Sequence, residues 1–157
     1  RIPLDEDEVR ELVDLLGFKP KVEPRNVSIV GARDLDSKER RIIKESGVHV
    51  FTMRDIDERG MREVMTEALR FATDDTDGIA VDLDMDFVDP EDAPGVGTPV
   101  RGGVTYREAH LALEMIADSE AMVSLEVVEI NPVIDEHNKT AILGVELILS
   151  GLGKKIL

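Results

Sequence analysis

Three acidic residues at alternating positions follow a short apolar run. The run is Gly78-Ile79-Ala80-Val81, and Asp82, Asp84 and Asp86 come directly after it. Because side chains two residues apart on a strand point to the same side, the three carboxylates would share one face where a buried strand emerges. Uncompensated buried charge is costly, and hard divalent cations with oxygen ligands, Mg²⁺ or Mn²⁺, are the natural compensation. A solvated strand end is the alternative, which the apolar run disfavours.

Acidic residues also lie near two other expected strands. Glu129 interrupts the apolar sequence 127–130, where it is either an inward-facing functional group or a surface residue at a strand edge. Asp36 and Glu39 follow another short strand, but their Asp-x-x-Glu spacing is also a helix-capping pattern. Acids gathered at neighbouring strand ends repel one another unless a cation lies among them. The sequence therefore predicts a cation-binding site at the ends of these neighbouring strands.

Strands and helices alternate along the chain. We expect strands at 27–30, 48–51, 78–81 (continuing into 82–86) and 123–130, and helices at 5–16, 37–46, 58–72, from 105 onward and at 139–152. This alternation predicts an α/β fold with a parallel sheet and helices on both faces. The length of 157 residues suits a single domain, 1–157. In such sheets, ligands bind beyond the carboxyl ends of the strands.

The segment 89–103 is a long expected loop. It holds three of the seven prolines and four of the twelve glycines. Loops of this length inside a compact domain are usually functional or disordered. So many prolines next to a buried strand favour a shaped, functional loop.

Composition narrows the classes of function. The formal net charge of −15 disfavours a nucleic-acid binder, because an acidic surface repels phosphate backbones. The chain has no cysteine, which fits a reducing, cytoplasmic compartment. We expect no membrane span, since the apolar stretch 141–153 is short and broken by Glu146.

Four motifs occur in order along the second half of the chain. They are DMDFVDP at 84–90, APGVGTP at 93–99, GGVTYRE at 102–108 and EINP at 129–132. Together they resemble the arginases of the ureohydrolase family, which also includes agmatinase and formiminoglutamase. The segment RDLD at 33–36 is similar to the arginase substrate loop. The third and fourth motifs look more like arginase than agmatinase, which tends to have Ser in place of Asn131.

The resemblance implies a three-layer α/β/α fold and a binuclear manganese centre that hydrolyses L-arginine to L-ornithine and urea. It implies that Asp84 bridges two metal ions and that Asp86 binds one of them. Asp82 stands where many members have Ser. The implied substrate-binding residues are Glu129 for the guanidinium, Asp36 and Glu39 for the α-amino group, and Thr98 for the pocket lining, with Glu129 also the catalytic residue that orients the substrate. The resemblance further implies a homo-oligomer, a trimer or hexamer.

The resemblance covers residues 27–157 well and residues 1–26 weakly. Two family segments, Gly-Gly-Asp-His and Asp-Ala-His-x-Asp, which supply the remaining metal ligands, are absent from this sequence. We therefore expect the chain to be the C-terminal half of an arginase, with weak metal binding and no turnover on its own.

Three alternatives stay open. The first is an agmatinase-type ureohydrolase. The second is a non-catalytic fragment or assembly module. The third is a Mg²⁺-dependent phosphatase using Asp84 and Asp86, for which Lys139 would be a poorly placed downstream lysine.

Overall fold

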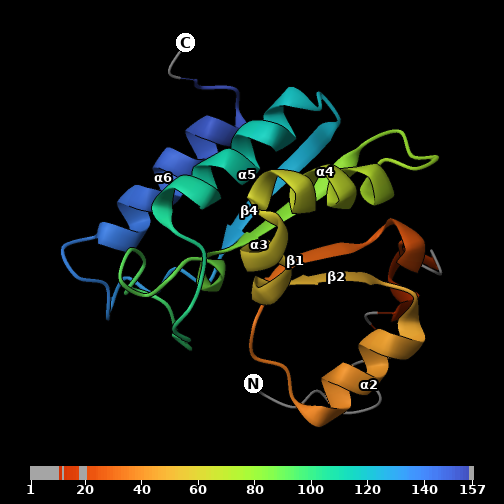
Figure 1. Cartoon of the computed structure of the whole chain (residues 1–157), viewed down its shortest axis with the longest axis horizontal. Helices are drawn as coiled ribbons and strands as arrows, with labels where there is room; N and C mark the ends of the chain where they lie inside the picture. The colour runs from red at the N-terminus through yellow and green to blue at the C-terminus, as the bar shows by residue number, and fades with distance from the viewer. Residues whose placement is uncertain (1–10, 12, 18–20, 156–157) are drawn as a thin grey trace.

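The structure, a computed structural model, describes residue 11, residues 13–17 and residues 21–155 (Figure 1). Most of the helix expected at 5–16 lies outside the described residues. The strands are β1 Ser28–Ala32, β2 His49–Thr52, β3 Ile79–Asp84 and β4 Met122–Val128. The helices are α2 Ser37–Ser46, α3 Met53–Arg59, α4 Met61–Ala72, α5 Tyr106–Asp118 and α6 Lys139–Gly151, with short 3₁₀ helices at Leu15–Gly17, Pro24–Asn26 and Met85–Phe87.

The strands form two parallel pairs, β1 with β2 and β3 with β4. The α/β class and the parallel strands are thus confirmed. The described strands do not form one continuous sheet, however, because no strand among residues 21–155 joins β1 to β3. The carboxyl ends of β1 and β3 are nevertheless joined, because the guanidinium of Arg33, just after β1, donates to the carbonyl of Asp86, just after β3.

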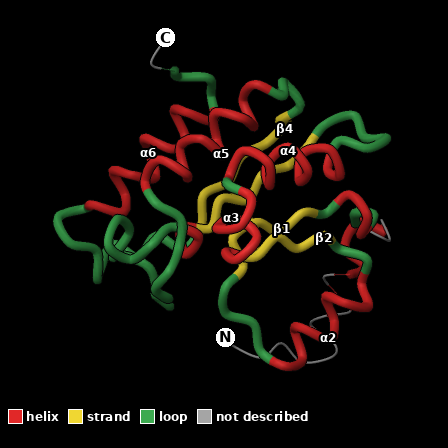
Figure 2. The backbone as a smooth tube through the Cα atoms, viewed as in Figure 1, coloured by secondary structure: helices red, strands yellow, loops and turns green. Residues whose placement is uncertain are grey.

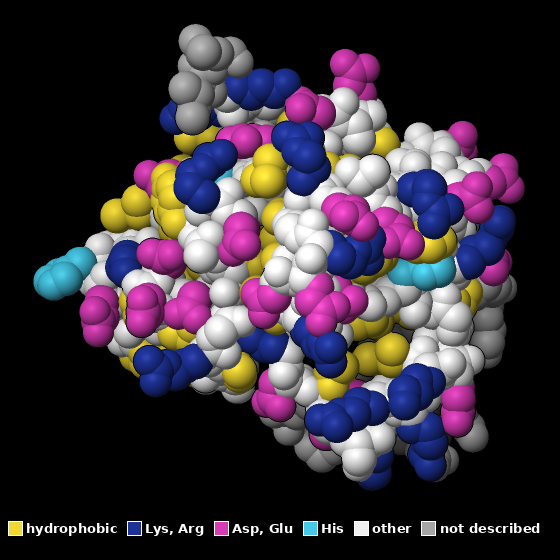
Figure 3. Space-filling view, viewed as in Figure 1, with side chains coloured by type: hydrophobic (Ala, Val, Ile, Leu, Met, Phe, Trp, Pro, Cys, Tyr) yellow, Lys and Arg dark blue, Asp and Glu magenta, His cyan; other side chains and the backbone are white. Residues whose placement is uncertain are grey.

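Helices lie on both sides of the strands (Figures 1 and 2). On one side α4 packs on β1 and on α5, and α5 packs on α6, so that these helices form a continuous layer. In the viewing direction that Figures 1 and 2 share, β1 and β2 run between α4 and α2. None of the residues of α2 is buried. Figure 3 shows the surface hollowed between α2 and the rest of the molecule.

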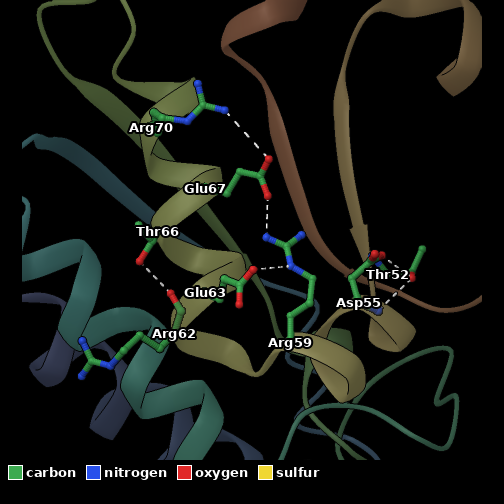
Figure 4. A network of polar contacts seen from close by, with 8 residues as sticks. All are labelled: Thr52, Asp55, Arg59, Arg62, Glu63, Thr66, Glu67 and Arg70. Carbon is green, nitrogen blue, oxygen red and sulfur yellow. Dashed lines mark hydrogen bonds and ion pairs between the residues drawn. The ribbon is translucent and has the colours of Figure 1, made fainter.

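The helix expected at 58–72 is two helices, so this prediction was wrong at its start. Gly60 has φ +80°, a conformation that favours glycine, and it separates α3 from α4. A capping box between Thr52 and Asp55 begins α3 at Met53, five residues earlier than expected. Arg59, the last residue of α3, then links the two helices by donating to Glu63 of α4 at 3.1 Å and to Glu67 of α4 at 2.5 Å (Figure 4).

The core lies between the helical layer and β3. Apolar faces of α4, α5 and α6 meet buried residues of β3 and of the loop that follows it. Fully enclosed side chains include Val64, Met85, Val88, Leu113 and Leu147. Val88 and Val104 form a parallel bridge that ties the start of this loop to its end. Among the described residues, no helix is both long enough and apolar enough to cross a membrane.

Candidate functional site

Asp84 and Asp86 lie together at the carboxyl end of β3, but not as alternate strand residues. β3 ends at Asp84, and the chain turns there into the 3₁₀ helix Met85–Phe87. Asp84 caps this turn, its Oδ1 accepting the N–H of Asp86 at 2.8 Å. The expectation that Asp82, Asp84 and Asp86 share one strand face is therefore wrong for Asp86. A tight turn, and not the strand pleat, brings the Asp86 carboxylate to the site.

Thr98 reaches the same place from the long loop. Its hydroxyl donates to Oδ2 of Asp86 at 2.7 Å. The other oxygen, Oδ1 of Asp86, is buried and has no hydrogen-bond partner among the described residues. Buried polar atoms are nearly always paired, so an orphaned carboxylate oxygen here fits a missing electropositive ligand.

The electrostatics of Asp84 also favour a bound cation at this place. Burial raises the pKa of Asp84, and the nearby charges of Asp86, Glu129 and Asp82 raise it further, against the lowering effect of the Asp86 N–H bond. The ionised form of Asp84 is therefore destabilised in this setting. A cation placed between these carboxylates would relieve both the desolvation and the repulsion. The residues present thus fit part of a divalent metal shell.

The described residues do not complete such a shell. Among residues 21–155, no group of three or more His, Cys, Asp or Glu side chains is arranged to hold a metal ion. Asp82 and its neighbour in register, Glu126, are both exposed on the face of β3 and β4 that points away from α5. These two acids add negative charge near the site but do not complete a metal-binding shell.

Glu129 lies just past β4, which ends at Val128, so the strand expected at 123–130 is shorter than predicted. Its φ of +64° is a left-handed conformation that non-glycine residues rarely adopt. Oε2 of Glu129 lies 3.6 Å from the position that a Cβ on Gly97 would take. Its charge also acts on Asp84. The structure thus places Glu129 at the same edge as Asp84, Asp86 and Thr98, and strained backbone of this kind is common at functional sites.

Asp36 and Glu39 form the capping box of α2. Asp36 Oδ1 accepts the N–H groups of Lys38 at 2.7 Å and Glu39 at 2.9 Å, and Glu39 Oε2 accepts the Asp36 N–H at 2.9 Å. The capping alternative is therefore confirmed for both residues.

Arg33 is a residue of the site that sequence reasoning did not assign. Its Nη2 donates to the carbonyls of Asp86 at 2.6 Å and Val100 at 2.7 Å, and its Nε donates to Val100 at 3.1 Å. One guanidinium thereby joins the end of β1 to both ends of the segment that carries Thr98. The motif RDLD offered a signal, but the partners of Arg33 are 53 and 67 residues away in sequence.

The loop at 89–103 is shaped by its own acid and by close packing, as predicted. Asp89 accepts the N–H groups of Glu91, Gly102 and Gly103, and the first of these bonds does most to lower the pKa of Asp89. A Cβ on Gly103 would lie 2.5 Å from the Asp89 nitrogen, so only glycine fits there. Ala93 and Val96 are buried.

The middle of the loop is held by α6 and by the chain after β4. The N–H of Gly95 donates to Oγ1 of the fully buried Thr140 at 2.7 Å. The N–H of Asn131 donates to the carbonyl of Gly95 at 2.8 Å. These two bonds fix the loop, and with it Thr98, relative to Glu129.

Fold and site together define an α/β protein with a carboxylate-rich site at the carboxyl ends of its parallel strands. Comparison with known proteins makes the assignment specific. The Arginase family model matches residues 17–153. The chain belongs to the arginase family.

The relatives and the solved structures agree. The chain is 53% identical to the arginase of Bacillus subtilis (strain 168) and 51% identical to that of Brevibacillus brevis, in each case over 93% of this chain and 49% of the relative. The crystal structure of the arginase from Bacillus caldovelox superposes with a TM-score of 0.90 at 46% identity, covering 93% of this chain and 49% of that one. The chain therefore spans about half the length of the relatives it matches.

Proposed function

We propose that this chain carries the carboxyl-terminal part of an arginase site, for the hydrolysis of L-arginine to L-ornithine and urea. The observation that supports this best is the convergence of Asp84, Asp86, Thr98 and Glu129 at one edge, with Oδ1 of Asp86 unpaired. Relatives with 41–53% identity are arginases, which favours this substrate over the agmatinase alternative.

Asp84 and Asp86 are the proposed metal ligands in this chain, and manganese, as two ions, is the proposed metal. Carboxylate oxygens suit Mn²⁺. When bound, such ions supply the positive charge that makes water a competent nucleophile near neutral pH. Within this chain, Thr98 orients Asp86 by donating to Oδ2, which leaves Oδ1 as the oxygen that would hold a metal ion.

Glu129 is the proposed anchor of the substrate guanidinium. A planar cation with several N–H donors pairs well with a carboxylate, and the fixed loop at Gly97 limits where that cation can lie. Asp36 and Glu39, at the start of α2, are proposed to contact the α-amino group. This arrangement would hold arginine by both ends, so that its guanidinium carbon is presented to the attacking water in one orientation.

We further propose that the separate chain binds metal weakly and does not turn over, because its described residues supply only part of a metal shell. The phosphatase alternative loses support, since Lys139 donates to the carbonyl of Glu91 at the base of α6. A homo-oligomer, trimer or hexamer, and a cytoplasmic location belong to the same proposal for the parent protein; the lack of cysteine fits the latter.

The test is urea release from L-arginine with added Mn²⁺, with a generic phosphate ester as a second substrate. We expect activity in a longer parent protein and none in this chain. In the parent, Glu129→Gln should lower kcat/KM at least about 100-fold by removing the charge that holds the guanidinium. The matched control is Glu126→Gln, on the exposed face of β4, which should change it less than about twofold. Equal activity of both variants, or phosphate release, would contradict the assignment.

A further inference from the structure

The polar groups of Asp86 are held from three directions. Its N–H donates to Oδ1 of Asp84, its Oδ2 accepts the hydroxyl of Thr98, and its carbonyl accepts Nη2 of Arg33. The carbonyl of Val100 accepts both Nη2 and Nε of the same guanidinium, at 2.7 Å and 3.1 Å. The guanidinium thus closes a ring of contacts that joins the end of β1, the turn after β3 and the long loop.

A guanidinium suits this place better than an ammonium group. Its planar fork carries five N–H donors at fixed angles, so that one side chain can bond two carbonyls at once, whereas a lysine offers a point charge. The charge also reaches the base of the loop. The N–H of Glu91 does most to lower the pKa of Asp89, and the positive charge of Arg33 lowers it further. Both the shape and the charge of Arg33 therefore act on this part of the molecule.

The backbone of β1 touches the same turn just before Arg33. Gly31 has φ +85°, and the register between β1 and β2 shifts there, between Val30 and Ala32. A Cβ at Gly31 would lie 2.5 Å from the ring of Phe87, the last residue of the turn, so only glycine lets the two segments approach this closely. The end of β1 is therefore fixed to the turn at two places, the contact of Gly31 with Phe87 and the bonds of Arg33.

The proposed contacts for the α-amino group follow in the chain. Asp36 is three residues after Arg33, and three residues span at most about 11 Å. Asp36 and Glu39 form the capping box that begins α2, so that their carboxylates move with the start of that helix. None of the residues of α2 is buried, so packing of this helix contributes little to where its start lies. The anchor at Arg33 is therefore a main constraint on the position of both carboxylates relative to Asp86.

We propose that Arg33 is a positioning residue that sets the distance between the α-amino contacts and Asp86, and so selects amidine substrates by the length of their side chain. This inference rests on the proposed function. Arg33 acts through Asp36 on one side and through Asp86 on the other. A substrate one methylene longer than L-arginine would then fit one end of the site but not both.

The first test compares substrates in a longer parent protein with added Mn²⁺. The variants are Arg33→Met and Arg33→Lys, and the matched control is Arg54→Met, an exposed arginine that pairs with Glu58 of the same helix. For both Arg33 variants we expect kcat/KM to fall at least about tenfold more for L-arginine than for its analogue without the α-amino group. The preference for L-arginine over L-homoarginine should narrow by a similar factor. The control should leave both ratios unchanged.

The second test uses this chain itself and needs no turnover. Because the chain has no cysteine, spin labels can be attached at Ser37→Cys, at the start of α2, and at Val145→Cys, which is 58% exposed on α6. Electron–electron resonance then measures the distance between the two labels. We expect a distribution at least about twofold wider in Arg33→Met than with Arg33 in place, because the start of α2 loses its anchor.

Unchanged label distances in Arg33→Met would overturn the positioning role. Equal losses for L-arginine and for its analogue without the α-amino group would make Arg33 a structural residue only, and wild-type ratios in Arg33→Lys would show that charge alone is needed; either result overturns the proposal. A parent protein that releases no urea with Arg33 in place would contradict the proposed function, and the label distances would still decide whether Arg33 positions α2.

Discussion

Thr140 offers a direct test of how α6 holds the long loop. The Thr140 side chain is fully buried, and its Oγ1 accepts the N–H of the buried Gly95 at 2.7 Å. Thr140→Val keeps the shape of the side chain but removes its hydroxyl, so that the buried N–H of Gly95 loses its acceptor and the Asp135 carboxylate loses a side-chain hydrogen bond. An unsatisfied buried donor costs about 1–3 kcal/mol. We therefore expect the free energy of unfolding to fall by about that amount, and Tm to fall by roughly 2–12 °C in a domain of this size.

Urea unfolding at pH 7, followed by circular dichroism, measures this loss, and an unchanged slope would show that the variant stays two-state. Exchange of the Gly95 amide should become faster in the same variant. The matched control is Thr66→Val on the exposed face of α4, where the hydroxyl bonds the carbonyl of Arg62 (Figure 4). The control should change stability by less than about 0.5 kcal/mol. If Thr140→Val costs no more than the control, the loop is not held through this bond.

Three further predictions follow from the charged groups. Asp84→Asn should raise Tm in metal-free buffer at pH 7, because burial and the neighbouring acids destabilise the ionised form and raise its pKa, and it should abolish any stabilisation by Mn²⁺. Asp89→Asn should lower the free energy of unfolding at pH 7, because backbone N–H bonds, the one from Glu91 first, lower the pKa of Asp89 in the folded state. In urea titrations the difference from wild type should vanish as the pH falls below 3.8 and passes through that lowered pKa. Burial lowers the pKa of His110 below 6.5, so its imidazole should stay neutral in the native state as the unfolded chain protonates, and an NMR titration midpoint at or above 6.5 would contradict this.

The sequence predicted the elements that depend on local patterns. The helix at 37–46 has the predicted bounds, and the capping boxes at Asp36 and Thr105 form as their spacing indicates. The four strands occur within two residues of their predicted starts. These features depend on contacts between residues three or four apart, or on a short apolar run, so that the sequence contains the information directly.

The errors in the predicted bounds have identifiable physical causes. The split between α3 and α4 depends on Gly60, and glycine inside an amphipathic pattern is easily read as a tolerated interruption. The turn at Asp84 depends on a local cap, the Asp84 carboxylate accepting the N–H of Asp86, which the alternating pattern concealed. The early end of β4 before Glu129 is accompanied by a contact far along the chain, the bond from the Asn131 N–H to the carbonyl of Gly95. Periodicity cannot show where a strand stops when the residues that end it are distant in sequence.

What the sequence by itself determined is the α/β class, the family and the acids that gather at the strand ends, because residue types and their spacing carry that information. Only the tertiary structure decided how these acids meet. The bond from Thr98 to Asp86, the bonds by which Arg33 joins β1 to the loop, and the pairing of β1 with β2 and of β3 with β4 all join segments at least 12 residues apart. Their positions are set by packing of the helical layer against the strands, a property of the whole folded chain that no local pattern records.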